Sequence, residues 1–131
     1  MIPLWQKLIR KPKKISNLKF EDVSKILTEA RSLFEKENLL LEFNLKKDDE
    51  IYVLGDIHGN FDSLLKLYEL IKKNQPKLVI FLGDIVDRGP LQVECLIFVL
   101  LLKILEPKRY YILKGNHETD IIRKDQIKIC L

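Results

Sequence analysis

Three short glycine-containing blocks hold the residues of this chain whose types and spacing could carry out chemistry. They are Gly55-Asp56-Ile57-His58-Gly59, Gly83-Asp84-Ile85-Val86-Asp87-Arg88-Gly89 and Gly115-Asn116-His117-Glu118, and they include both histidines of the chain. Carboxylates, imidazoles and amide oxygens are ligands for divalent metal ions. The guanidinium of Arg88 offers a planar fork that matches phosphate oxygens. The blocks therefore predict a metal site suited to the hydrolysis of phosphate esters.

The first block predicts half of a metal site. In an extended segment, residues two apart point the same way, so Asp56 and His58 would converge on one ion. Gly55 and Gly59 would let the backbone turn tightly and leave room for ions. Taken alone, this block also fits a turn aspartate beside a structural histidine.

The other two blocks add a bridging ligand and a proton donor. Asp84 could bridge two ions through its carboxylate oxygens, as in sites that hold ions about 3.5–4 Å apart and lower the pKa of a shared water. Asn116 could bind an ion through its amide oxygen, and His117 could protonate the leaving alkoxide. Asp87 is the candidate that would hold His117 in the right tautomer. Glu118 is expected to be structural rather than catalytic.

Hydrophobic periodicity predicts the elements that position these blocks. We expect helices over 20–37 and 90–105 and a helix behind an Asn60 cap that includes residues 64–71 and ends before Pro76, with strands over 51–54, 78–82 and 109–113. The connections between strands are long enough to require parallel pairing, which predicts an α/β fold. Each block then follows the carboxyl end of a strand, where open α/β sheets bind ligands.

Length and composition exclude several classes of protein. A chain of 131 residues, 47% hydrophobic and 32% charged, suits one domain. The net charge of +4 is modest and the lysines are scattered, so we expect no nucleic-acid partner. No apolar run approaches the ~20 residues of a membrane span, so we expect no membrane role. Cys95 and Cys130 have no paired spacing, which favours a reduced, cytoplasmic protein without cysteine catalysis.

Two segments suggest how the chain is organised. Residues 1–16 are expected to form a basic N-terminal arm, mobile or loosely docked, and residues 17–131 the α/β domain. Within the helix over 90–105, residues 95–102 are apolar on all sides and must be covered. We expect the chain to lack enough material for this cover, which would come from a missing half of the domain or from a partner.

The blocks closely resemble a known signature. GDIHG, GDIVDRG and GNHE are similar to the motifs of the phosphoprotein phosphatase family of Ser/Thr protein phosphatases, within the calcineurin-like metallophosphoesterase superfamily. The spacings of 28 residues from Asp56 to Asp84 and 32 from Asp84 to Asn116 also fit that family. The resemblance covers about residues 17–120 and implies the N-terminal half of an α/β/β/α sandwich.

The resemblance implies a metal-ion set for this chain. Asp56 and His58 would bind the first ion, Asp84 would bridge, and Asn116 would bind the second ion. The resemblance implies two divalent metal ions, with manganese as the preferred metal and iron and zinc as the alternatives. The nucleophile would be a metal-bridging hydroxide, with no phosphoenzyme.

The resemblance also implies the remaining roles. His117 would be the general acid, oriented by Asp87, while Arg88 and Asn116 would hold the substrate phosphate. The substrate would be phosphoserine or phosphothreonine in a protein, and a regulatory subunit is a further expected partner.

The chain also departs from the family pattern. Family domains are longer and contribute two further metal-binding histidines and a second phosphate-binding arginine, whereas no histidine follows His117 here. Residues 17–131 are therefore expected to be an incomplete domain that holds about half of the site.

Two alternative functions stay open. One is a nucleotide metallophosphoesterase such as a diadenosine tetraphosphatase, although those enzymes usually carry Asp where this chain has Glu118. The other is a non-catalytic truncated fragment that binds a partner.

Overall fold

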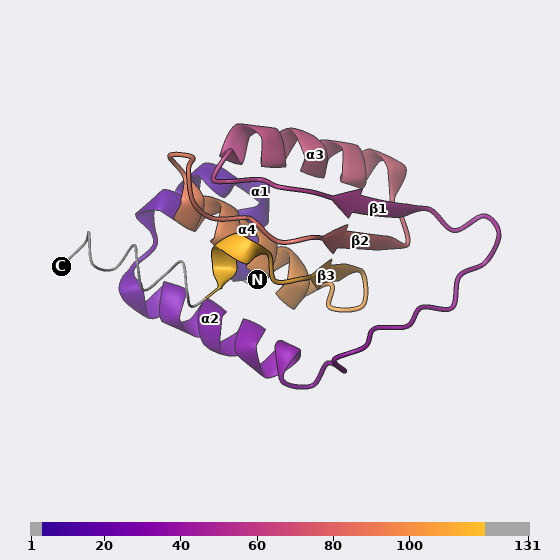
Figure 1. Ribbon diagram of the computed structural model, residues 1–131. Helices are drawn as coiled ribbons and strands as arrows, with labels where there is room; N and C mark the ends of the chain where they lie inside the picture. The colour runs from indigo at the N-terminus through magenta and orange to yellow at the C-terminus, as the bar shows by residue number, and fades with distance from the viewer. Residues whose placement is uncertain (1–3, 120–131) are drawn as a thin grey trace.

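The computed structural model describes residues 4–119 and has a mixed α/β fold (Figure 1). Its elements are α1 (Leu4–Arg10), the 3₁₀ turn η1 (Pro12–Asn17), α2 (Phe20–Phe34), β1 (Ile51–Leu54), α3 (Phe61–Asn74), β2 (Leu78–Phe81), α4 (Gln92–Leu105), β3 (Tyr110–Ile112) and the 3₁₀ turn η2 (Asn116–Glu118). The predicted fold class is confirmed, as is the predicted order of elements from α2 to β3. The helix α1 and the turns η1 and η2 were not predicted, and the other differences lie at the ends of elements, as where α2 stops at Phe34. Cys130 lies outside the described residues.

The three strands form one parallel sheet in the order β1-β2-β3. Val79 of the central strand lies opposite Tyr52 on one side and Tyr110 on the other. Val79 and Phe81 are fully buried, which agrees with the apolar character predicted for a central strand. Because parallel strands run in the same direction, all three carboxyl ends meet at one edge of the sheet.

The two crossover helices cover one face of this sheet. Both β-α-β connections move in the same direction across the sheet. Because such crossovers are right-handed, α3 and α4 lie on the same side of the sheet. Phe98 of α4 packs edge-on against Phe61 and Tyr68 of α3, with ring centroids 5.8 and 5.2 Å apart. As predicted, Asn60 caps α3, because its Oδ1 accepts the Ser63 N–H at 3.1 Å. The core therefore lies between the sheet and α4.

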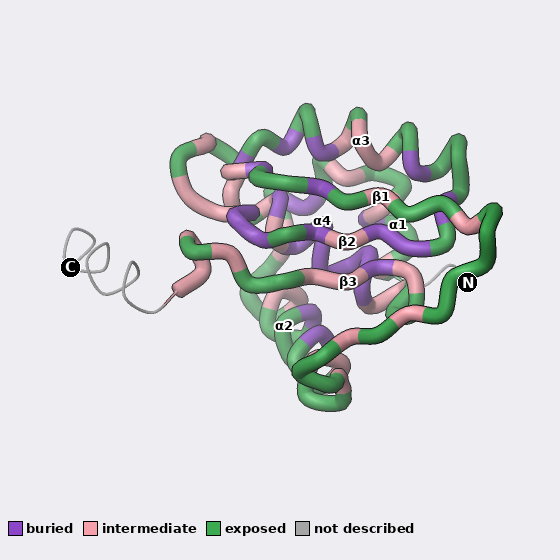
Figure 2. The backbone as a smooth tube through the Cα atoms, turned by 45° about the vertical axis from the view of Figure 1, so that its right-hand side comes forward, coloured by how far each residue is buried: buried purple, intermediate pink, exposed green. Residues whose placement is uncertain are grey.

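The opposite face of the sheet is largely exposed (Figure 2). Val53 at the end of β1 is 56% exposed, and Leu82 and Leu113, just after β2 and β3, are 46% and 44% exposed. Phe43, in the long connection before β1, packs edge-on against Tyr111 with ring centroids 4.7 Å apart. The sheet thus separates a helix-covered face from an open one.

The apolar helix α4 is covered, contrary to the expectation from its sequence. Its residues from Ile97 to Lys103 are all buried. Besides α3 and β3, the elements that pack on it are α2, α1 and η1. The last two come from the predicted N-terminal arm, where Leu8 and Ile15 are 4% and 3% exposed. The mobile or loosely docked state expected of the arm is therefore wrong for residues 4–16, because these apolar side chains supply the cover. Among residues 4–119, no helix is long and apolar enough to span a membrane.

A buried lysine fixes the end of α4. Lys103 is 1% exposed, forms an ion pair with Glu37 and donates a hydrogen bond to the Pro107 carbonyl at 2.8 Å. Its ammonium also lies 4.3 Å from the centroid of the Tyr111 ring. The charge is thus paired and hydrogen-bonded, as burial requires. These contacts connect α4 to the chain that follows α2 and to β3.

Candidate active site

The three glycine blocks form adjacent loops at the carboxyl edge of the sheet. The first two loops are joined through their backbones, because the Asp84 carbonyl accepts the N–H groups of Ile57 and His58 at 3.0 and 2.9 Å. The Ile85 carbonyl accepts the Gly59 N–H at 2.9 Å. Residues about 28 positions apart in the sequence are therefore held within one site.

Two glycines allow the second and third loops to approach closely. A Cβ atom on Gly83, whose φ is +98°, would lie 2.1 Å from the Gly115 nitrogen. A Cβ on Gly115 would lie 2.2 Å from Oδ1 of Asp84. Gly55 differs, because its Cβ would face open space and its φ is outside the left-handed region, so packing among the described residues does not require glycine there.

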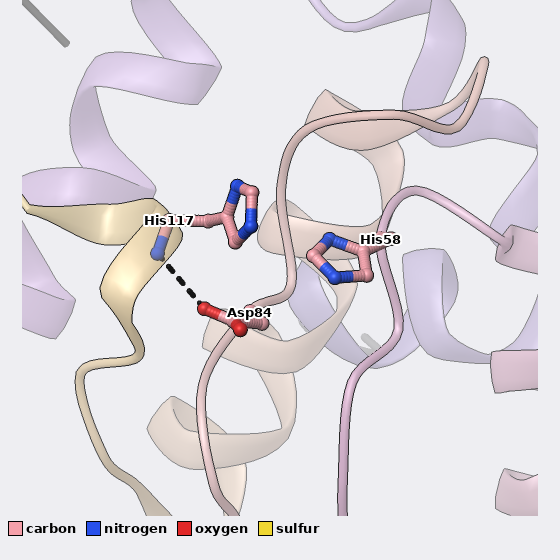
Figure 3. Close-up of side chains that lie close together, drawn as sticks. All are labelled: His58, Asp84 and His117. Atoms are coloured by element: carbon pink, nitrogen blue, oxygen red, sulfur yellow. Dashed lines mark hydrogen bonds between the residues drawn. The ribbon is translucent and has the colours of Figure 1, made fainter. Parts of the chain in front are cut away.

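Three predicted site residues form a cluster that could hold a metal ion. One ligand atom each from His58, Asp84 and His117 lie within 4.8 Å of one another, and the three side chains come from three different loops (Figure 3). The two imidazole rings meet edge-on with centroids 4.7 Å apart. The dashed line in Figure 3 marks the His117 backbone N–H donating to Asp84 Oδ1 at 2.9 Å. Carboxylate and imidazole donors fit a divalent transition-metal ion.

The hydrogen bond of His58 prepares it for metal binding. Its Nδ1 lies 2.9 Å from the Val86 carbonyl oxygen, which can only accept, so Nδ1 carries the proton. The Nε2 lone pair is therefore free for a metal ion, as in many sites where an outer partner fixes the tautomer of a ligating histidine. Sequence reasoning missed Val86, because an apolar residue that acts through its backbone leaves no signal in a motif.

The other two predicted ligands are less closely held. Asp56 Oδ2 lies 3.6 Å from His58 Nε2, and the Asp56 side chain is 66% exposed. Asn116 begins η2 next to His117 and is exposed. Its side chain makes no hydrogen bond to the other predicted ligands in the part of the chain that the structure describes. The structure therefore places Asp56 beside His58, whereas Asn116 is the exposed residue directly before His117.

The predicted proton donor and its orienting carboxylate are in contact. His117 Nδ1 lies 3.1 Å from Asp87 Oδ2, and both side chains are 14% exposed. The Arg88 guanidinium donates toward Nε2 of the same ring at 3.4 Å. Gln92, which the sequence did not single out, accepts the Asp87 backbone N–H at 2.9 Å and fixes that loop. The ring nitrogen opposite Asp87 thus faces the predicted phosphate-binding arginine.

Backbone strain is concentrated at this site. His58, Asp84, Asp87 and Arg88 have positive φ values of 46°, 50°, 66° and 68°. Among the described residues, the only other non-glycine residue with positive φ is Gln75, which ends α3. Such conformations cost about 1–3 kcal/mol each and are found where function requires them. The strain therefore falls on four of the seven residues that the motifs predict and not on Asp56, Asn116 or His117.

Comparison with known proteins agrees with this geometry. The sequence profile described as calcineurin-like phosphoesterase matches residues 50–129, which is more than half of the chain. The chain belongs to the calcineurin-like phosphoesterase family. Its site residues from Asp56 to Glu118 all lie within the matched segment.

Several members of the calcineurin-like phosphoesterase family are similar to this chain. Human serine/threonine-protein phosphatase 5 is 40% identical over 96 residues, which are 72% of this chain and 19% of that protein. The yeast (Saccharomyces cerevisiae) serine/threonine-protein phosphatase 2B catalytic subunit A2 is 39% identical over 106 residues, 81% of this chain and 17% of that protein. The chain thus spans about a fifth of the length of these curated relatives.

A solved structure of the family supports the fold. A serine/threonine phosphatase from Saccharomyces cerevisiae, described as similar to human phosphatase PP5, superposes with a TM-score of 0.70 at 34% sequence identity. The match covers 82% of this chain and 35% of that chain. The fold of this chain is therefore that of a metallophosphoesterase.

Proposed function

We propose that this chain carries part or all of a site for metal-dependent hydrolysis of phosphoserine and phosphothreonine in proteins. The observation that carries the proposal is the cluster of His58, Asp84 and His117 beside the hydrogen-bonded pair of His117 and Asp87. Relatives at about 40% identity are named as Ser/Thr protein phosphatases, which supports this substrate class. Because the chain spans about a fifth of their length, its activity by itself belongs to the proposal.

The metal ligands follow the predicted set. Asp56 and His58 would hold one ion, Asp84 would serve both ions and Asn116 would hold the second, whereas His117, which lies beside His58 and Asp84, would remain the proton donor. This mixture of carboxylate, imidazole and amide donors suits manganese, with iron or zinc as alternatives. When bound, two such ions would lower the pKa of a water molecule and neutralise charge on the phosphate.

The residues around the cluster would complete the reaction. Arg88 would hold phosphate oxygens through its planar fork, beside the ring of His117. With Arg88 directed to the phosphate instead of to Nε2, His117 would give a proton from Nε2 to the oxygen of the departing serine or threonine, while Asp87 accepts the hydrogen bond of Nδ1–H and stabilises the charged ring. Asp87 itself keeps its negative charge and moves no proton.

Side-by-side hydrolysis tests the substrate class. The purified chain with Mn²⁺ is given a phosphoserine peptide, and separately diadenosine tetraphosphate, and a chelator control measures the metal-independent rate. We expect metal-dependent release of phosphate from the peptide to exceed cleavage of the dinucleotide by about tenfold or more. Faster cleavage of the dinucleotide, or release that the chelator does not affect, would contradict the proposal.

A further inference from the structure

We propose that Glu118 is a positioning residue whose carboxylate holds the loop of Asp84 and thereby sets the geometry of the metal cluster. This role rests on the proposed function, because that function gives Asp84 and His58 their part in metal binding. Glu118 lies directly after His117 in η2, and its side chain reaches across to the second loop.

Four backbone N–H groups donate to the Glu118 carboxylate. Oε2 accepts from Asp84 at 2.8 Å and from Gly115 at 2.9 Å. Oε1 accepts from Ile85 at 2.8 Å and from Val86 at 3.3 Å. Successive backbone N–H groups that converge on one point form an anion-binding nest, and the N–H groups of residues 84, 85 and 86 converge on this carboxylate. The anion in this nest is a side chain of the protein itself.

The same contacts connect Glu118 to every member of the cluster. Asp84, only 8% exposed, donates its own N–H to the carboxylate and receives the His117 N–H on Oδ1. The Val86 N–H donates to Glu118, and the Val86 carbonyl accepts a hydrogen bond from His58 Nδ1. A shift of Glu118 would therefore move Asp84 directly and His58 through one residue.

The nest discriminates among possible side chains at this position. A glutamine would place its NH₂ group against backbone donors and keep a single acceptor oxygen, so about half of the hydrogen bonds would be lost. An aspartate keeps both oxygens and the charge but is shorter by one methylene, about 1.5 Å, which is too short to reach both loops fully. We therefore expect the site to be best ordered with Glu, less ordered with Asp and least ordered with Gln.

Backbone amide exchange tests this role on the whole metal-free chain. Exchange rates at residues 84, 85, 86 and 115 are compared by NMR in the native protein, Glu118→Gln and Glu118→Asp. Glu94→Gln serves as the matched control, because Glu94 is also partly buried and accepts a hydrogen bond, from Ser16 Oγ at 2.7 Å, but lies on α4 outside the site. We expect the exchange rates of these four amides to rise about tenfold or more over the native protein in Glu118→Gln and to rise less in Glu118→Asp. The control should keep the native rates.

Titration with Co²⁺ adds a readout that general destabilisation would not move. We expect Glu118→Gln to weaken Co²⁺ binding about 10- to 100-fold and to change its visible absorption, with partial recovery in Glu118→Asp. Native amide exchange in both Glu118 variants, or a control that changes as much as they do, would overturn the proposal. If Glu118→Gln does not fold, Glu118→Asp decides by the same criteria. A native chain that bound no Co²⁺ would count against the proposed metal site, whereas the exchange rates would still decide whether Glu118 holds the loop.

Discussion

At the scale of single residues, the chemistry depends on side chains whose backbone is strained. Types and spacing in the three blocks were enough to predict that the blocks meet, because each block follows a strand end. They could not predict that Val86 would hold His58, or that Glu118 would accept four N–H groups. Except for the hydrogen bond from Gly115, those contacts join segments about 30 residues apart, and backbone partners leave no trace in residue types. The expectation that Glu118 is structural agrees with these contacts.

Replacing the carboxylate that orients His117 tests its role in proton transfer. Asp87→Asn keeps the shape of the side chain but removes the charge that stabilises a protonated ring. We expect hydrolysis of a phosphoserine peptide to fall about tenfold or more, and hydrolysis of p-nitrophenyl phosphate to fall much less, because nitrophenolate leaves without a proton. Steady-state rates of both substrates are measured. Asp48→Asn, in an exposed turn, is the control, and equal losses for both substrates would argue against the role.

Two glycines at block starts should respond differently to alanine. Gly83→Ala adds a Cβ 2.1 Å from the Gly115 nitrogen at a φ of +98°, whereas Gly55→Ala adds one with no atom of the described residues within 4 Å. We expect Gly83→Ala to lower the free energy of unfolding by about 2 kcal/mol or more. Gly55→Ala should change it by no more than about 0.5 kcal/mol. Urea denaturation of both variants decides, and similar costs would show that the close approach of the two loops is not maintained in solution.

At the scale of elements, the sequence predicted the strands and helices well and the surroundings of α4 poorly. Alternating strands and helices allow few topologies, and the length of the connections between the strands was enough to predict parallel pairing. The cover of α4 could not be predicted, because α1 and η1 are short, contain basic residues and are separated from α4 by more than 70 residues. Their few apolar side chains show their function only when the contact is seen.

The buried thiol of Cys95 in α4 should make the protein less stable as the pH rises above about 9. Burial raises the pKa of Cys95 from 9.0 to about 12. Between these values the unfolded chain loses the proton while the folded chain keeps it, so the free energy of unfolding falls as pH rises. One such group contributes about 1.4 kcal/mol per pH unit in this window.

Urea unfolding at about pH 8 and about pH 10.5 measures this effect. We expect the native protein to lose more stability between the two conditions than Cys95→Ala, in which the buried thiol is absent. The comparison of slopes cancels the titration of Cys130 and of the tyrosines, which both proteins share. If the free energy of unfolding of Cys95→Ala falls with pH as steeply as that of the native protein, the thiol ionises equally in the folded and unfolded states.

At the scale of the whole molecule, residues 4–17 belong to the core of the described structure. Leu8 and Ile15 pack into the same cluster as Phe98 and Val79, so the helical N-terminus and the sheet share one apolar interior. The division into an arm over 1–16 and a domain over 17–131 is a prediction that the comparisons do not test. One sheet face stays open, where Val53, Leu82 and Leu113 are exposed.

A pair of leucines in α1 tests whether the N-terminal helix stabilises the fold. Leu8 is 4% exposed and Leu4 is 46% exposed on the same helix. We expect Leu8→Ala to lower the free energy of unfolding by about 2–4 kcal/mol, through lost burial and a residual cavity. Leu4→Ala should cost less than about 1 kcal/mol. Equal, small costs in chemical denaturation would indicate that α1 does not remain docked on α4.

The central claim is that the carboxyl edge of this sheet is a metal-dependent phosphoesterase site organised around Asp84. The most direct test is the rate of Mn²⁺-dependent phosphate release from a phosphoserine peptide by the native chain and by Asp84→Asn, after circular dichroism has shown that both are folded. Asparagine keeps the size of the side chain but removes the charge and the second metal-binding oxygen. We predict a loss of about a hundredfold or more in Asp84→Asn. Equal rates in the two proteins would contradict the claim.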